Sequence, residues 1–82
     1  MVSEDYFNKL KKIIAAQLGI DELEITEDSH LQDDLNADPI SIADLIVEIE
    51  GEFHIKIPQN QAADFNTVGD ILSFILDQTG DL

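Results

Sequence analysis

The segment DPISIADLIVEIEGEF, from Asp38 to Phe53, is the most regular stretch of the sequence. Its apolar residues recur three and four positions apart, at Ile42, Leu45, Ile46, Ile49 and Phe53. Asp38 can accept a hydrogen bond from a free N–H of the first turn, and Pro39 suits the first helical position, where a backbone N–H has no partner. The pattern predicts a capped amphipathic helix with one buried stripe. The helix is not expected to continue through Pro58.

A second stripe of the same helix is acidic. Asp44, Glu48 and Glu52 follow one another at intervals of four residues. Like charges at that spacing weaken an isolated helix by about 0.2–0.5 kcal/mol per pair. This stripe is therefore either a solvated face that tolerates the cost or a face that meets a basic partner.

Helical patterns also lie on both sides of this segment. We expect a first helix from Ser3, as N-cap, to Leu18, with Gly19 as its stop. Its apolar stripe consists of Phe7, Leu10, Ile14 and Leu18. A long connection without helical period follows, from Gly19 to Ala37, and its scattered apolar residues suggest that it lies across the helices. These residues are Ile20, Leu23, Ile25, Leu31 and Leu35.

The C-terminal third predicts two further helices. A short one is expected over Asn60–Phe65, and a longer one from Thr67 to a stop at Gly80. Thr67 and Asp70 have the spacing of a capping box, in which each side chain accepts a hydrogen bond from the other residue's N–H. Three longer helices, a short one and a long first loop predict an all-α fold, a small four-helix bundle that forms one domain over residues 1–82.

The composition excludes several classes of function. The 82 residues include 18 Asp and Glu against four Lys, for a net charge of −14, and no Cys. Nucleic acids and anionic membranes repel such a charge, whereas basic protein surfaces attract it. Without Cys there are no disulfides or thiolate metal sites. No apolar run reaches the roughly 18–20 residues of a membrane span and no leader pattern opens the chain, so we expect a monomeric cytoplasmic protein.

The same residues carry a family resemblance. The stretch LQDDLNADPISIADL, from Leu31 to Leu45, resembles the acyl carrier protein pattern Leu-x-x-Asp-Leu-Gly-Ala-Asp-Ser-Leu. Glu52-Phe53 and Ile57-Pro58 resemble the family's Glu-Phe and Ile-Pro further on, and the likeness extends over essentially the whole chain. The resemblance implies a four-helix bundle of acyl-carrier-protein type.

The resemblance also implies a function. Acyl carrier proteins hold 4′-phosphopantetheine on the Ser of Asp-Ser-Leu and carry acyl groups on its thiol in fatty-acid or polyketide-type biosynthesis. A phosphodiester at a helix N-terminus faces free N–H groups and the positive end of the helix dipole. The resemblance implies that the chain is not an enzyme and that it docks on basic surfaces of acyl-handling or synthase enzymes. The implied docking residues here are Asp38, Ile40, Asp44, Glu48 and Glu52.

The sequence departs from the family at the attachment site. Between Asp38 and Ile40, where the family has its Ser, this chain has Pro39, which has no hydroxyl. The family's acid and Leu five and six positions later match Asp44 and Leu45 when counted from Pro39, but not when counted from Ser41.

Three hypotheses follow. An arm could be attached to Ser41, which lies about 200° around the helix from Pro39. The chain could instead dock on acyl-handling enzymes without an arm, as an adaptor or regulator. It could also bind a partner unrelated to lipids.

Other patterns predict little chemistry. His30 and His54 are far apart in the sequence and are expected to be ordinary surface residues. The acids lack the EF-hand spacing, so no metal site is expected. The chain offers too few residues to build an oxyanion hole and a substrate pocket around a Ser-His-Asp trio, which excludes a hydrolase of that type.

Overall fold

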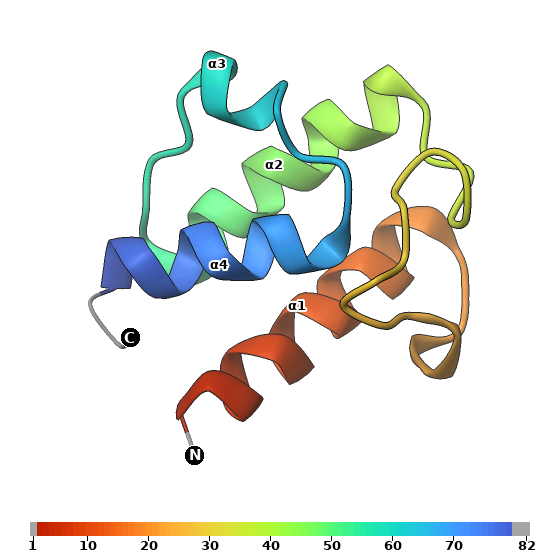
Figure 1. The fold of residues 1–82 in the computed structure, drawn as a ribbon, viewed down its shortest axis with the longest axis horizontal. Helices are drawn as coiled ribbons and strands as arrows, with labels where there is room; N and C mark the ends of the chain where they lie inside the picture. Colours follow the sequence, from red (N-terminus) through yellow and green to blue (C-terminus); the bar gives the residue numbers. More distant parts are fainter. Residues whose placement is uncertain (1, 80–82) are drawn as a thin grey trace.

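The computed structural model describes residues 2–79, which form four α-helices and one short 3₁₀-helix. The helices are α1 (Val2–Leu18), α2 (Pro39–Phe53), α3 (Gln59–Ala62) and α4 (Val68–Thr79), and the 3₁₀-helix η1 is Glu22–Glu24. Figure 1 shows α1, α2 and α4 as the three long elements, with α3 across from α2 on the side away from α1. The predicted all-α four-helix architecture is confirmed.

The predicted helix ends agree with the structure to within a few residues. α1 already begins at Val2, so the prediction of Ser3 as N-cap is wrong, because Ser3 lies inside the helix. Gly19 ends α1 in the left-handed region with φ of +70°, as expected for a glycine stop. The short helix covers Gln59–Ala62, whereas the prediction was Asn60–Phe65. Beyond Ala62 the chain forms turns as far as Phe65 and does not continue the helix. The predicted stop at Gly80 lies outside the described residues.

The capping box at the start of α4 is present. Thr67 N–H donates to Asp70 Oδ2 at 3.1 Å, and Asp70 N–H donates to Thr67 Oγ1 at 3.2 Å. Asn66 N–H also donates to Asp70 Oδ2, at 2.9 Å. The two backbone N–H groups hold the pKa of Asp70 below its ordinary value.

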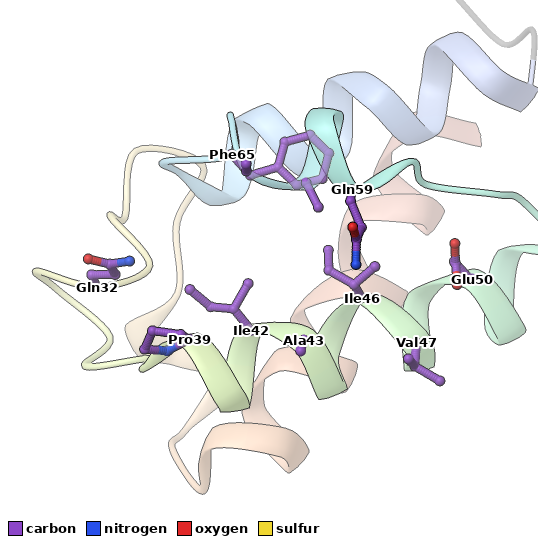
Figure 2. A pocket seen from close by; sticks show the side chains of 11 residues that line it. Gln32, Pro39, Ile42, Ala43, Ile46, Val47, Glu50, Gln59 and Phe65 are labelled. Atoms are coloured by element: carbon purple, nitrogen blue, oxygen red, sulfur yellow. The ribbon is translucent and has the colours of Figure 1, made fainter.

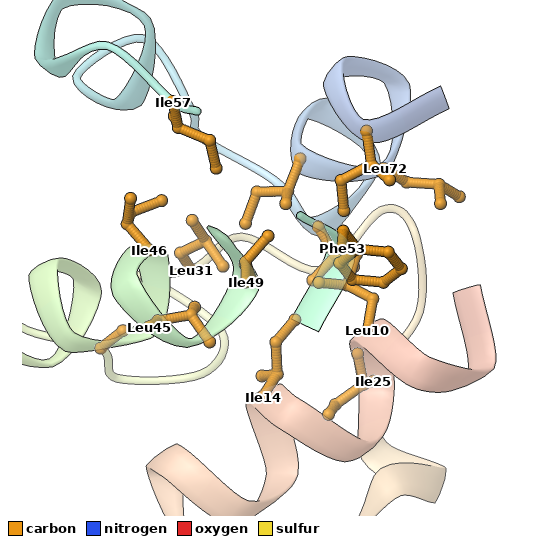
Figure 3. Close-up of a cluster of buried hydrophobic side chains, with 14 of the residues drawn as sticks. Leu10, Ile14, Ile25, Leu31, Leu45, Ile46, Ile49, Phe53, Ile57 and Leu72 are labelled. Atoms are coloured by element: carbon orange, nitrogen blue, oxygen red, sulfur yellow. The ribbon is translucent and has the colours of Figure 1, made fainter. Parts of the chain in front are cut away.

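One hydrophobic core joins the three long helices (Figure 3). Leu10 and Ile14 of α1 face Leu45 and Ile49 of α2, and all four are fully buried. The predicted stripe of α2 is buried from Leu45 to Phe53, while Ile42 is partly buried. α4 contributes Val68, Ile71, Leu72, Ile75 and Leu76.

The long connection from Gly19 to Ala37 is part of this core, as predicted for a segment that lies across the helices. Ile25, Leu31 and Leu35 are buried, whereas Leu23 on η1 is 88% exposed, so the expectation was wrong for that residue. The connection is also bonded to the start of α4. Val68 N–H donates to Ser29 O at 3.0 Å, and a β-bridge pairs His30 with Thr67.

Candidate functional site

The N-terminus of α2 is a capped helix start. Asp38 is the N-cap in extended conformation, and its Oδ1 accepts a hydrogen bond of 2.7 Å from Ser41 N–H. This bond, reinforced by the Ser41 side chain, lowers the pKa of the exposed Asp38 carboxyl. Pro39 is the first helical residue and is exposed to solvent. The local structure is the one that the sequence predicted from the Asp-Pro pair.

Asn36, just before this site, is in the left-handed region with φ of +58°. Glycine adopts this conformation at least cost, and Asn is the next best residue for it. The pattern that this chain resembles has Gly at the same point. The left-handed backbone conformation at Asn36 thus explains why few residue types other than Gly and Asn suit this position.

Ser41 lies in the first turn of α2, and its side chain is partly exposed. The backbone N–H of Ser41 donates to Asp38 Oδ1, which places this residue in the cap of the helix. Ser41 is absent from the residues that line the groove described next, whereas Pro39 is one of them. The two positions therefore face different surroundings.

A groove of about 580 Å³ runs between α2 and the α3 segment. Figure 2 shows Ile42 and Ile46 of α2 directed towards Phe65 and Gln59 on the opposite wall. Gln32 and Pro39 lie at one end of the groove, and Glu50 lies at the other. The remaining lining residues are Ala43, Val47, Ala62 and Ala63.

This groove was not predicted from the sequence. Part of its signal was present in α2, which has apolar residues at 43 and 47 in addition to its predicted core stripe. A helix with apolar residues on more than one face covers more than one apolar surface. The position of α3, which supplies the other wall, depends on tertiary packing and has no such signal.

The outward face of α2 combines acidic and apolar side chains. Asp44 and Glu48 are exposed, and within the described residues neither of them forms an ion pair. Ile40 is 75% exposed and Val47 is 65% exposed. Glu52 differs from the other acids, because its Oε2 lies 3.7 Å from Lys9 Nζ of α1. Of the four acids among the five predicted docking residues, Glu52 is the one that forms an ion pair within the described part of the chain.

The two histidines lie in separate structural settings. His30 Nδ1 is 3.5 Å from Asp34 Oδ2, and the His30 backbone pairs with Thr67. His54 ends α2 in the left-handed region with φ of 57°. Within the part of the chain whose side chains are described, residues 5–79, no three His, Cys, Asp or Glu side chains form a group that could hold a metal ion. The same residues contain no helix long and apolar enough to cross a membrane.

Comparisons with known proteins give the family. The model of the family described as "Phosphopantetheine attachment site" matches residues 8–75. The chain belongs to the acyl carrier protein family. It is 33% identical to the acyl carrier protein from Enterococcus faecalis, whose solved structure superimposes with a TM-score of 0.79 over 95% of this chain and 99% of that one.

The residues at the start of α2 do not fit the family's cofactor at the usual position. A phosphopantetheine ester requires a hydroxyl oxygen, and the Pro39 side chain consists only of CH₂ groups that close a ring on the backbone nitrogen. The rest of the helix start is intact, with Asp38 as cap, its carboxylate accepting from Ser41 N–H and its carbonyl oxygen accepting from Ile42 N–H. The departure is therefore confined to one side chain on an otherwise complete helix start.

Proposed function

We propose that this chain is a carrier-fold interaction module that docks on acyl-handling enzymes and has no phosphopantetheine arm of its own. Membership of the acyl carrier protein family supports the acyl context. The observation that carries the proposal is Pro39, exposed at the first position of α2 and without a hydroxyl. The chain has no catalytic role in this proposal.

The alternative is a carrier whose arm is attached to Ser41. Two positions along a helix correspond to a rotation of about 200°, so a transferase that expects its Ser at position 39 would meet a different side of the helix. Ser41 also lies outside the groove between α2 and α3, whereas Pro39 lines it. Both observations favour docking without an arm.

The acidic face of α2 is the proposed docking surface. Asp44 and Glu48 are exposed and available to Lys or Arg of a partner, and Ile40 and Val47 add apolar area beside them. Charge complementarity of this kind accelerates association and selects the partner, and its contribution falls with added salt. The net charge of −14 opposes self-association, which supports a monomer.

Intact mass spectrometry tests for the missing arm. The chain is incubated with coenzyme A and a phosphopantetheinyl transferase of broad specificity, next to the variant Pro39→Ser. We expect no mass gain for the wild type and a gain of one phosphopantetheine for the variant, because the fold still presents the site. A gain in the wild type that peptide mapping assigns to Ser41 would establish the alternative.

The docking surface is tested by reversing its charge. The double variant Asp44→Lys and Glu48→Lys should lose most of its binding to a purified carrier-dependent acyl transferase in 50 mM salt. The matched control is Glu24→Lys with Asp28→Lys, which changes the net charge equally at exposed positions of the long connection. Equal weakening by both pairs would mean that only total charge matters. Binding to no acyl-handling enzyme would favour a partner outside lipid chemistry.

A further inference from the structure

A second groove, here called the α4 groove, lies between α4 and the segment that follows α3. Its volume is about 470 Å³. That segment returns from α3 to the start of α4 (Figure 1). The apolar part of the groove consists of Phe65 from the segment and Phe74 from α4, whose ring centroids are 5.7 Å apart at an interplanar angle of 64°. Both residues are only half-buried, so aromatic surface remains accessible in this groove.

Three carboxylates stand around the two rings. Asp70, Phe74 and Asp77 follow one another at intervals of four and three residues, so they share one face of α4. Asp64 belongs to the segment that forms the other wall. Asp64 and Asp77 are exposed, and neither forms an ion pair within the part of the chain that the structure describes. The α4 groove therefore combines an aromatic floor with a negatively charged rim.

The lysines of the chain do not serve this groove. All four lie on α1 or just after α2, and none of them lines the α4 groove. Phe7 on α1 provides the contrast, because Lys11 Nζ lies 4.8 Å from the centroid of its ring. The carboxylates around the α4 groove also form no group that could hold a metal ion within residues 5–79. An organic cation from outside the chain therefore suits this groove better than an inorganic one.

We propose that the α4 groove binds the guanidinium of an arginine presented by a partner protein. A guanidinium is planar and weakly hydrated, so it stacks on an aromatic ring while it donates paired hydrogen bonds to a carboxylate. The compact ammonium of lysine does not provide this combination. A guanidinium over Phe74 has a carboxylate on either wall as its partner, Asp77 on α4 and Asp64 on the segment after α3. This inference does not depend on the proposed function, because it involves neither Pro39 nor the acidic face of α2.

Titration with two peptides tests the selection of arginine. Both peptides have ten residues of Gly and Ser, with three Arg in one and three Lys in the other. The ¹⁵N-labelled full chain should bind the Arg peptide about two- to fivefold more tightly, the range expected for a cation–π contact at an exposed site. The dissociation constant is read from the amide resonances of Asp64, Phe74 and Asp77, which separates this groove from the acidic face of α2.

Substitutions of the ring locate the preference. Phe74→Leu keeps an apolar side chain but removes the aromatic face, so it should abolish the preference for Arg. Phe7→Leu is the matched control, because that half-buried ring lies on α1, and it should leave the preference unchanged. Ser73 is exposed and lines the groove, so Ser73→Arg supplies a competing cation without altering a buried residue. This variant should weaken binding of both peptides, and it decides the matter if Phe74→Leu does not fold.

Neutralising the carboxylates separates the groove from the total charge. Asp64→Asn with Asp77→Asn should weaken binding of both peptides at the α4 resonances. Asp44→Asn with Glu48→Gln removes the same charge from α2 and should weaken it much less. Equal weakening by the two pairs would show that only net charge attracts the peptides, and it would overturn the proposal. Equal affinity of the wild type for the Arg and Lys peptides would overturn it too, and either result would leave docking on α2 untouched.

Discussion

Helix α2 and the long connection before it bury similar residues but hold them by different means. α2 places Leu45, Ile49 and Phe53 in the core at the regular spacing of a helix. The connection from Gly19 to Ala37 has no such period, and it buries Ile25, Leu31 and Leu35 individually while its backbone bonds to the start of α4. The comparison shows that an irregular segment can join the core without a helical period when its anchors and its backbone both have partners.

Truncation of one anchor in each region gives the largest expected effect. Leu31 is 1% exposed and Ile49 is fully buried, so Leu31→Ala and Ile49→Ala should each lower the free energy of unfolding by about 2–5 kcal/mol. Leu23→Ala is the control, because that side chain is 88% exposed and should change stability by less than about 0.5 kcal/mol. Urea denaturation measures all three. A loss below about 1 kcal/mol for Leu31→Ala, with a large loss for Ile49→Ala, would show that the connection lies outside the cooperative core.

Two glycines provide a second comparison of the same regions. A Cβ on Gly69 would lie 3.0 Å from Glu27 O of the connection, an atom that also accepts a 2.8 Å hydrogen bond from Gly69 N–H. Gly69→Ala should therefore push the connection away from α4 and lower stability by about 1–3 kcal/mol. A Cβ on Gly51 of α2 meets nothing within 4 Å, so Gly51→Ala should raise stability by about 0.5–1 kcal/mol through helix propensity.

Thermal unfolding of the two variants gives the comparison directly. Opposite changes in melting temperature are expected for the same chemical substitution. A rise in both variants would mean that the contact between the connection and α4 is loose enough to absorb a methyl group.

The contrast also explains what the sequence could predict. The start and the buried face of α2 were predicted correctly, because its cap, its first-position proline and its apolar period are local signals. The sequence could not show that Leu31 is buried while Leu23 is exposed. Both are leucines among acidic residues, and only contacts with residues distant in the sequence make their surroundings different. At the site, Pro39 and the acidic face were visible in the sequence, whereas the groove required α3, whose placement has no periodic signal.

The capping box ties the stability of the connection to pH. Backbone N–H groups of Asn66 and Thr67 lower the pKa of Asp70 in the folded chain. The folded state thus favours the ionised carboxylate, so the stabilisation is complete above the unfolded pKa of about 3.9 and is lost as the pH falls through the lower folded value. Asp38, whose pKa is also lowered, contributes with the same sign.

The substitution Asp70→Asn should lower stability at pH 7 by about 0.5–1 kcal/mol, a small value because the carboxylate is exposed to solvent. The deficit should shrink towards pH 2–3, where the wild type loses its charge too. Amide hydrogen exchange should rise first at Val68 and Leu31, whose N–H groups join the start of α4 to the connection. Asp77→Asn, which removes an exposed charge from the same helix, is the control. A deficit that does not depend on pH would contradict the role assigned to the Asp70 charge.

The smallest expected effect concerns the outward face of α2. Repulsion among its acids lowers stability, while the proposed docking requires the same charges. Glu48 has Asp44 four residues before it and Glu52 four residues after it, and like charges at this spacing repel. Glu48→Gln should therefore raise the free energy of unfolding by about 0.2–0.5 kcal/mol while weakening binding to a basic partner. Glu52→Gln is the matched control, because it also breaks the ion pair with Lys9 and should leave stability nearly unchanged. The urea midpoints of the two variants, measured in 50 mM salt where screening is weak, show whether repulsion along this face lowers the free energy of unfolding. If Glu48→Gln lowered the free energy of unfolding, the acidic face would stabilise the fold itself. Its assignment as a docking surface would then need other support.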